Sequence, residues 1–202
     1  MINFFKRKKP IKTEKDESLY NVLLKSEEEN SLVEIDFSNL SQDGRYRGEF
    51  EIEILKGRKL NREDSTKLNE AVLKFYERES DSVNLICDFF KDKRAIEVFS
   101  EFESFIFSLD IFEEKRLAGL SILLMRDTRV IEAIKFGIML AHFYPLVNYP
   151  AAVKIIVNLG IYPEFTYYSL GVLKQLNYYE LVRDNILRRG LKETQIIEEN
   201  ME

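Results

Sequence analysis

The sequence predicts a mainly α protein: a helical repeat-like stack or an orthogonal bundle with a small N-terminal β-hairpin. Three observations carry this prediction. After residue 60, apolar residues recur at helical spacing over most of the chain. Before residue 60, two short stretches alternate apolar and charged residues, which is the period of a strand. The composition, with 45% hydrophobic and 32% charged residues among 202, is that of an ordinary globular protein.

The chain divides into three parts. Residues 1–12 hold five basic residues and no acid, and we expect residues 1–15 to form a flexible basic tail. Residues 16–60 are expected to form an N-terminal helix and the β-hairpin. Residues 61–202 are expected to form an α-helical domain that packs with them, and a chain of this length buries about 70% of its unfolded surface.

The N-terminal part carries two different periodicities. Residues 16–29 place apolar side chains at helical spacing and acids in the first turn, where the helix dipole favours them. Residues 32–37 and 46–55 alternate around a turn-rich segment, which predicts a β-hairpin. An isolated hairpin is marginally stable, so its apolar face should pack on helices. The charged face of its second strand is Glu49, Glu51 and Glu53.

Helical patterns follow one another beyond Gly57. One is expected to start at Asn61, and another at Ser82. A third spans 93–109, and Asp110 with Glu113 is a capping-box candidate for a fourth. Seven of the fifteen Phe lie in residues 89–112, which predicts a dense core layer. Further helices are expected over residues 130–143, 164–176 and 178–189.

A weak internal repeat appears after residue 128. Ala133-Ile134-Lys135-Phe136 leads to Tyr144-Pro145, and Ala152-Val153-Lys154-Ile155 leads to Tyr162-Pro163. Two such units have the length of one helical repeat. On these residues the chain resembles HEAT- or armadillo-like helical repeat proteins over about residues 110–190. The resemblance implies a right-handed stack of helix pairs that binds partners on one face, and it implies no catalytic residues.

Residues 130–179 hold only five charged residues but seven of the ten Tyr. Tyr is enriched at protein interfaces because it buries a large area and keeps a polar group. The same side chains could instead fill gaps between helices. The candidate binding residues are Tyr144, Tyr149, Tyr162, Tyr167, Tyr168, Tyr178 and Tyr179.

The function we expect is a non-enzymatic protein-binding module, of the toxin-neutralising (immunity-type) or adaptor kind, without a cofactor. A formal net charge of -5 favours a basic protein partner. The alternative is a metal-dependent hydrolase or nuclease that uses Glu49, Glu51 and Glu53, since clustered carboxylates hold Mg²⁺ or Mn²⁺. The single Cys and single His leave little scope for other chemistry, and we expect Cys87 to be buried and inert.

The longest uncharged run, 136–153, is interrupted by Pro145 and Pro150, so we expect no membrane insertion. The basic tail offers only weak contacts with anionic membranes or nucleic acid, and no specific nucleic-acid motif is present. The N-terminus places apolar residues before basic ones, the reverse of a secretory signal. With the lone Cys87, this predicts a cytoplasmic protein.

Overall fold

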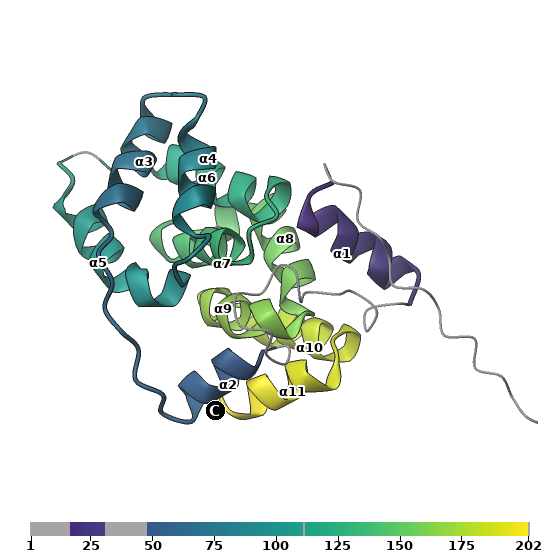
Figure 1. The fold of residues 1–202 in the computed structure, drawn as a ribbon. Coiled ribbons are helices and arrows are strands. Elements are labelled where there is room, and N and C mark those ends of the chain that lie inside the picture. Colours follow the sequence, from purple (N-terminus) through teal and green to yellow (C-terminus); the bar gives the residue numbers. More distant parts are fainter. Residues whose placement is uncertain (1–16, 31–47, 111, 202) are drawn as a thin grey trace, which may run out of the picture.

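The structure, a computed structural model, describes residues 17–30, 48–110 and 112–201. Across these residues the chain forms eleven α-helices, two short 3-10 helices and no strand, which confirms a mainly α fold (Figure 1). The helices are α1 (Leu19–Glu28), α2 (Glu49–Leu55), α3 (Thr66–Tyr76), α4 (Ser82–Phe89), α5 (Ala95–Ser108), α6 (Glu114–Asp127), α7 (Ile131–Met139), η2 (Leu140–Phe143), η3 (Leu146–Asn148), α8 (Pro150–Gly160), α9 (Pro163–Leu173), α10 (Tyr179–Arg189) and α11 (Lys192–Glu199).

Of the predicted β-hairpin, the structure describes only residues 48–55 of the second strand. The expected tail (1–15), first strand (32–37) and turn (38–44) lie outside the described residues. The second strand is wrong, because residues 49–55 form the helix α2. A short apolar–charged alternation does not by itself distinguish a strand from a helix, and tertiary packing decides.

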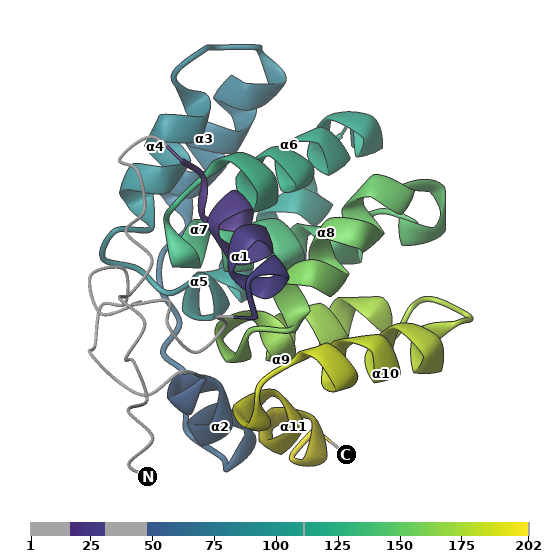
Figure 2. The ribbon, with the colours of Figure 1, turned by 90° about the vertical axis from the view of Figure 1, so that its right-hand side faces the viewer.

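Helix α2 is fixed by contacts at its N-terminal end. Gly48 precedes it with φ 70°, and a Cβ there would lie 2.7 Å from Cδ1 of Ile197. Phe50 is buried under the guanidinium of Arg94, 3.7 Å from the ring centroid. As a result α2 lies beside α11, although the two are far apart in sequence, and both Figure 1 and Figure 2 show them side by side.

Helix α7 is the centre of the molecule. All nine of its residues are buried, as its nearly continuous apolar sequence predicts. Gly137 allows α6 to approach closely, because a Cβ there would lie 3.0 Å from Cβ of Leu124. Phe136 packs edge-on against Phe102 of α5, with ring centroids 4.8 Å apart. The expected helix over 130–143 thus becomes an α-helix that ends at Met139 and tightens into η2.

Consecutive helices pack in pairs, and α6 with α7 and α8 with α9 make extensive contacts. The two repeat units fall on this region but are not equivalent in environment. Lys135 is buried in α7, whereas Lys154 is exposed on α8. Tyr144 and Tyr162 are both buried and both direct their hydroxyl groups to interior partners. The repeat therefore marks two similar tyrosine anchors more clearly than two similar lysines.

Helix α1 docks across α6 and α8 and is held at both ends (Figure 2). At its start, the backbone N–H of Leu19 donates to the carbonyl of Thr128 over 3.1 Å. At its end, both carboxylate oxygens of Glu27 accept from Arg189 of α10, over 2.6 and 2.7 Å. This fork-to-fork geometry is the strongest form of an arginine–carboxylate pair.

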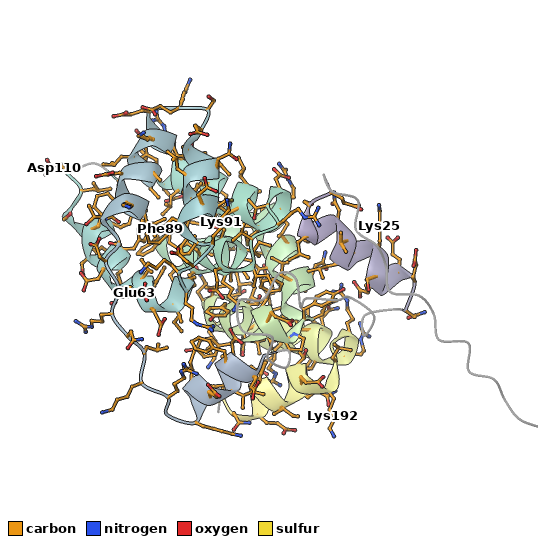
Figure 3. All side chains as sticks on the ribbon, viewed as in Figure 1. Lys25, Glu63, Phe89, Lys91, Asp110 and Lys192 are labelled. Atoms are coloured by element: carbon orange, nitrogen blue, oxygen red, sulfur yellow. The ribbon has the colours of Figure 1, made fainter. Side chains whose placement is uncertain are left out.

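Two expected helix caps are absent, and the structure shows why. The backbone N–H of Asn61 donates to Oε1 of Glu97, so Asn61 lies in the segment between α2 and α3, where it is bonded to α5. Glu63, labelled in Figure 3, lies in the same segment and pairs with Lys93 over 2.6 Å. Helix α3 begins only at Thr66. The residue before α6, Glu113, makes no side-chain cap bond, so the Asp110–Glu113 capping box is also wrong.

The phenylalanine-rich stretch is only partly a core layer. Phe90 and Phe102 are buried, and both rings contact Phe136. Phe107 and Phe112 instead expose 75% and 42% of their surface. The stretch therefore supplies both the core and part of the surface of the same region.

Candidate functional site

A charged cluster lies inside the protein, between α2, α7 and α9. Nζ of Lys135 lies 2.8 Å from Oε1 of Glu51 and 2.8 Å from Oε1 of Glu132. The hydroxyl of Tyr168 donates to the same Glu51 oxygen over 3.1 Å. The second oxygen of Glu132 accepts the backbone N–H of Ala95, the first residue of α5. The cluster therefore ties four helices together through one ammonium group.

The protonation of this cluster suits a structural role. Burial alone lowers the pKa of Lys135, but the adjacent Glu132 and Glu51 outweigh burial and raise it. Burial, followed by the charge of Glu51, raises the pKa of Tyr168. Lys135 therefore stays charged and Tyr168 stays neutral near neutral pH. A lysine that acts as a base or nucleophile needs a lowered pKa, so Lys135 does not fit that chemistry.

The carboxylates of the predicted metal site do not converge. On a strand Glu49, Glu51 and Glu53 would share one face, but a helix turns by about 100° per residue and separates Glu51 from the other two. Glu51 is buried against Lys135, and Glu53 pairs with Arg58. Among the described residues no group of three or more His, Cys, Asp or Glu is placed to hold a metal ion.

Three of the seven candidate tyrosines lie in the interior. The hydroxyl of Tyr144 lies 2.8 Å from Oγ of Ser121, and the hydroxyl of Tyr162 donates to the carbonyl of Leu23 over 2.8 Å. Tyr168 belongs to the charged cluster. Burial raises the pKa of Tyr144 to about 12. These side chains join helices, and a partner on the surface would not reach them.

The other candidate tyrosines are less buried. Tyr149 donates to Glu114 over 2.8 Å, and Tyr167 packs edge-on against Tyr168. Tyr179 is partly buried against the core. Of the seven, only Tyr178 is exposed, with 39% of its surface accessible, and it precedes Leu181 on α10, which is 72% exposed.

Neither the single Cys nor the single His has the surroundings of a nucleophilic pair. Cys87 is partly buried, and burial followed by the charge of Asp88 raises the pKa of its thiol to about 11. A reactive thiol needs a lowered pKa, so Cys87 fits the inert role that the sequence predicts. His142 lies elsewhere, in η2, where its ring packs on Phe99.

Phe107, the most exposed aromatic side chain among the described residues, marks a surface at the junction of α5 and η2. The rings of Phe107 and Phe143 lie 5.8 Å apart, and those of Phe143 and Phe99 lie 5.7 Å apart. His142 continues this row, and Glu103 lies between Phe99 and Phe107 on the α5 helix face. We call these five residues the α5 aromatic face. The helix ends at the outer edge of the molecule, near Asp110 in Figure 3.

The α5 aromatic face carries one acidic side chain, Glu103, and no lysine or arginine. The other two Glu of α5 lie off this face, and Glu97 is buried. Burial of the packed His142 ring lowers its pKa, and the nearby Glu103 only partly opposes this, so the imidazole is neutral at neutral pH. The C-terminal end of α5, where the helix dipole carries partial negative charge, lies beside Phe107. The face thus combines apolar rings with one carboxylate and the negative end of a helix dipole.

The sequence contained a signal for this face, but the core pattern obscured it. Phe99, Glu103 and Phe107 follow one another at intervals of four, which places them on one helix face. Val98 and Phe102 follow their own helical spacing on the neighbouring, buried side of α5. In the sequence, an exposed row of aromatic residues beside a buried row looks the same as one broad core face. The two can be distinguished only when the elements that cover the helix are known.

Comparisons with known proteins identify no relative of this chain. No family model matches the chain, and neither the curated proteins nor the solved structures contain a match. Among the described residues, no helix is both long enough and apolar enough to cross a membrane.

Proposed function

We propose that this protein is a non-enzymatic protein-binding module that uses the α5 aromatic face to hold a basic segment of a partner. The observation that carries the proposal is the exposure of Phe107, which leaves 75% of its surface open while its ring rests on Phe143. Full burial of such a side chain in an interface contributes about 1.5–3 kcal/mol. A single exposed apolar side chain is ordinary, but this one belongs to a connected row of rings.

The chemistry of the face selects the partner. A guanidinium or ammonium group over the open face of Phe107 gains a cation–π contact, and Glu103 can pair with the same cation. The carbonyl end of α5 favours positive charge at the same place. The partner segment therefore carries Arg or Lys next to an apolar side chain. The overall charge of -5 assists the encounter with a basic partner.

The scaffold suits this role because buried side chains of α5 and α7 support the α5 aromatic face. Phe102, next to Phe99 and Phe105 on α5, is buried and packs on Phe136 of the central helix. A surface supported in this way needs little reordering when it binds, which lowers the entropic cost of association. We place the module in the cytoplasm, in agreement with its lone thiol.

Two finer assignments belong to the same proposal. The pairing of α6 with α7 and of α8 with α9 supports a HEAT-like arrangement of helix pairs. An acidic protein with a prepared binding face and a basic target fits an immunity-type protein that neutralises a toxin domain, or an adaptor. Both assignments rest on the class of surface and not on a sequence motif.

The test is affinity capture from the native host with three forms of the protein. Wild type and Leu181→Ser should recover the same stoichiometric partner, because Leu181 is equally exposed but lies on α10. Phe107→Ser should lose it while keeping the same unfolding midpoint. Glu103→Gln should weaken capture by several fold, and salt should weaken capture by wild type. Equal recovery by wild type and Phe107→Ser, or no stoichiometric partner at all, contradicts the proposal.

A further inference from the structure

A groove of about 390 Å³ opens between the α3–α4 turn and α6. The turn stands at the top of Figure 1. The apolar residues Phe75, Val83 and Leu123 line it together with Arg78, Arg116 and the acidic Glu79. The volume lies within the range of small-molecule sites, which combine an apolar lining with a few placed polar groups.

Arg116 is held in place before any ligand binds. One of its terminal nitrogens donates to the carbonyl of Tyr76 at the end of α3, and its Nε pairs with Glu113 over 2.6 Å. These contacts use only part of its five N–H donors. The remaining donors are pre-organised, so an anion that reaches them does not need to order the side chain.

Arg78 occupies a backbone position that normally takes glycine. Its φ is 65°, and its N–H donates to the carbonyl of Phe75 while the next N–H, of Glu79, donates to Lys74. This is a Schellman helix end, in which the left-handed residue is usually Gly because a side chain there costs free energy. A residue held against its own preference is a reason to look for a role of its side chain.

The guanidinium of Arg78 is the unneutralised charge of the groove. Within the residues that the structure describes, it makes no ion pair or hydrogen bond. The other charges are matched, because Arg116 pairs with Glu113, and Lys74 lies 3.7 Å from Glu79. The groove therefore has one cation in excess above an apolar floor.

From this geometry we propose that the groove binds a small organic anion, with an apolar body against Phe75 and Leu123 and an acidic group between Arg78 and Arg116. Carboxylate, sulfonate and phosphate share the required chemistry, since each accepts charge-assisted hydrogen bonds from guanidinium donors. Gly119 lies beside the apolar body, and a Cβ there meets nothing within 4 Å. A larger side chain at position 119 would therefore fill the groove without disturbing its walls.

The test uses the full chain and the fluorescent anion anilinonaphthalene sulfonate, with its uncharged relative phenylnaphthylamine as the second probe. Wild type should bind the anion saturably at one site. Arg78→Gly should weaken binding of the anion at least about tenfold, because a charged hydrogen bond is lost. Binding of the neutral probe should stay unchanged. Arg78→Gly should also raise the urea midpoint, because glycine is preferred at φ 65°. That variant therefore separates loss of binding from loss of folding.

Two further variants locate the site. Gly119→Leu should abolish binding of both probes by occupying the groove, whereas Leu181→Ser, exposed on α10, should change neither. If wild type does not bind the anion saturably, the proposal is wrong. It is also wrong if Arg78→Gly binds the anion as tightly as wild type, or if binding survives in a folded Gly119→Leu protein.

Discussion

Lys135 and Glu51 form a buried ion pair, with 2.8 Å between Nζ and Oε1, that joins α7 to a helix 84 residues earlier in the chain. Glu132 is the second partner of the same ammonium group, over 2.8 Å. Two carboxylates therefore share one ammonium group. The lysine is therefore the member of the cluster on which the others depend.

Removing the lysine should cost more than removing one carboxylate. Lys135→Met leaves Glu51 and Glu132 buried without a counter-charge, and we expect the free energy of unfolding to fall by about 3–5 kcal/mol. Glu51→Gln keeps the Lys135–Glu132 pair, so we expect a loss of about 1–3 kcal/mol. Urea unfolding of the two variants measures the difference. A Glu51→Gln loss as large as that of Lys135→Met would contradict this view of the cluster.

The stability of the protein should fall in alkali. Burial raises the pKa of Tyr144 and of Tyr76 to about 12, above the ordinary value of about 10. Because these folded-state pKa values are raised, the stabilisation is complete below about pH 10 and is lost as pH rises towards 12. Burial, followed by the charge of Glu51, also raises the pKa of Tyr168. Tyrosinate absorbance and urea midpoints between pH 8 and 12 test this.

In that titration the buried tyrosines Tyr76, Tyr144 and Tyr168 should ionise only together with unfolding. If all tyrosines ionised in one step near pH 10 in a protein that stays folded, the placement of Tyr144 and Tyr168 in the interior would be wrong.

The close approach of α6 and α7 at Gly137 should tolerate no side chain. A Cβ there would lie 3.0 Å from Cβ of Leu124 and 3.1 Å from the carbonyl oxygen of Ser121, which cannot move aside. We expect Gly137→Ala to lower the free energy of unfolding by about 1–3 kcal/mol. The matched control is Gly171→Ala on α9, where nothing lies within 4 Å of the added Cβ. There the same change should stabilise by about 0.4–1 kcal/mol.

Local sequence pattern predicts much of the helical fold. The apolar spacing in 16–29, the start at Ser82 and the continuous apolar run of α7 all correspond to observed helices. The stretch 46–55 fails because its alternation fits a strand, while Gly48, α9 and α11 hold it as a helix. Helix α11 was not expected, because its acidic sequence buries only Thr194 and Ile197.

The sites depend on contacts that the sequence does not display. No local pattern joins Glu51 to Lys135, since burial of both depends on how α2 docks on α7. The tyrosine-rich body suggested a binding surface, yet Tyr162 is buried and its hydroxyl serves α1. Phe107 was visible as part of an aromatic stretch, but only the packing of α5 shows that it faces outward.

Photo-crosslinking in the native host tests the central claim most directly. The photoreactive residue p-benzoylphenylalanine replaces Phe107 in one form of the protein and Leu181 in another, since both positions are highly exposed. The account predicts one discrete adduct from position 107 and none from position 181. The crosslinked peptide of the partner should contain Arg or Lys beside an apolar residue. An adduct from position 181 alone, or none from position 107, would contradict the assignment of the α5 aromatic face as the binding surface.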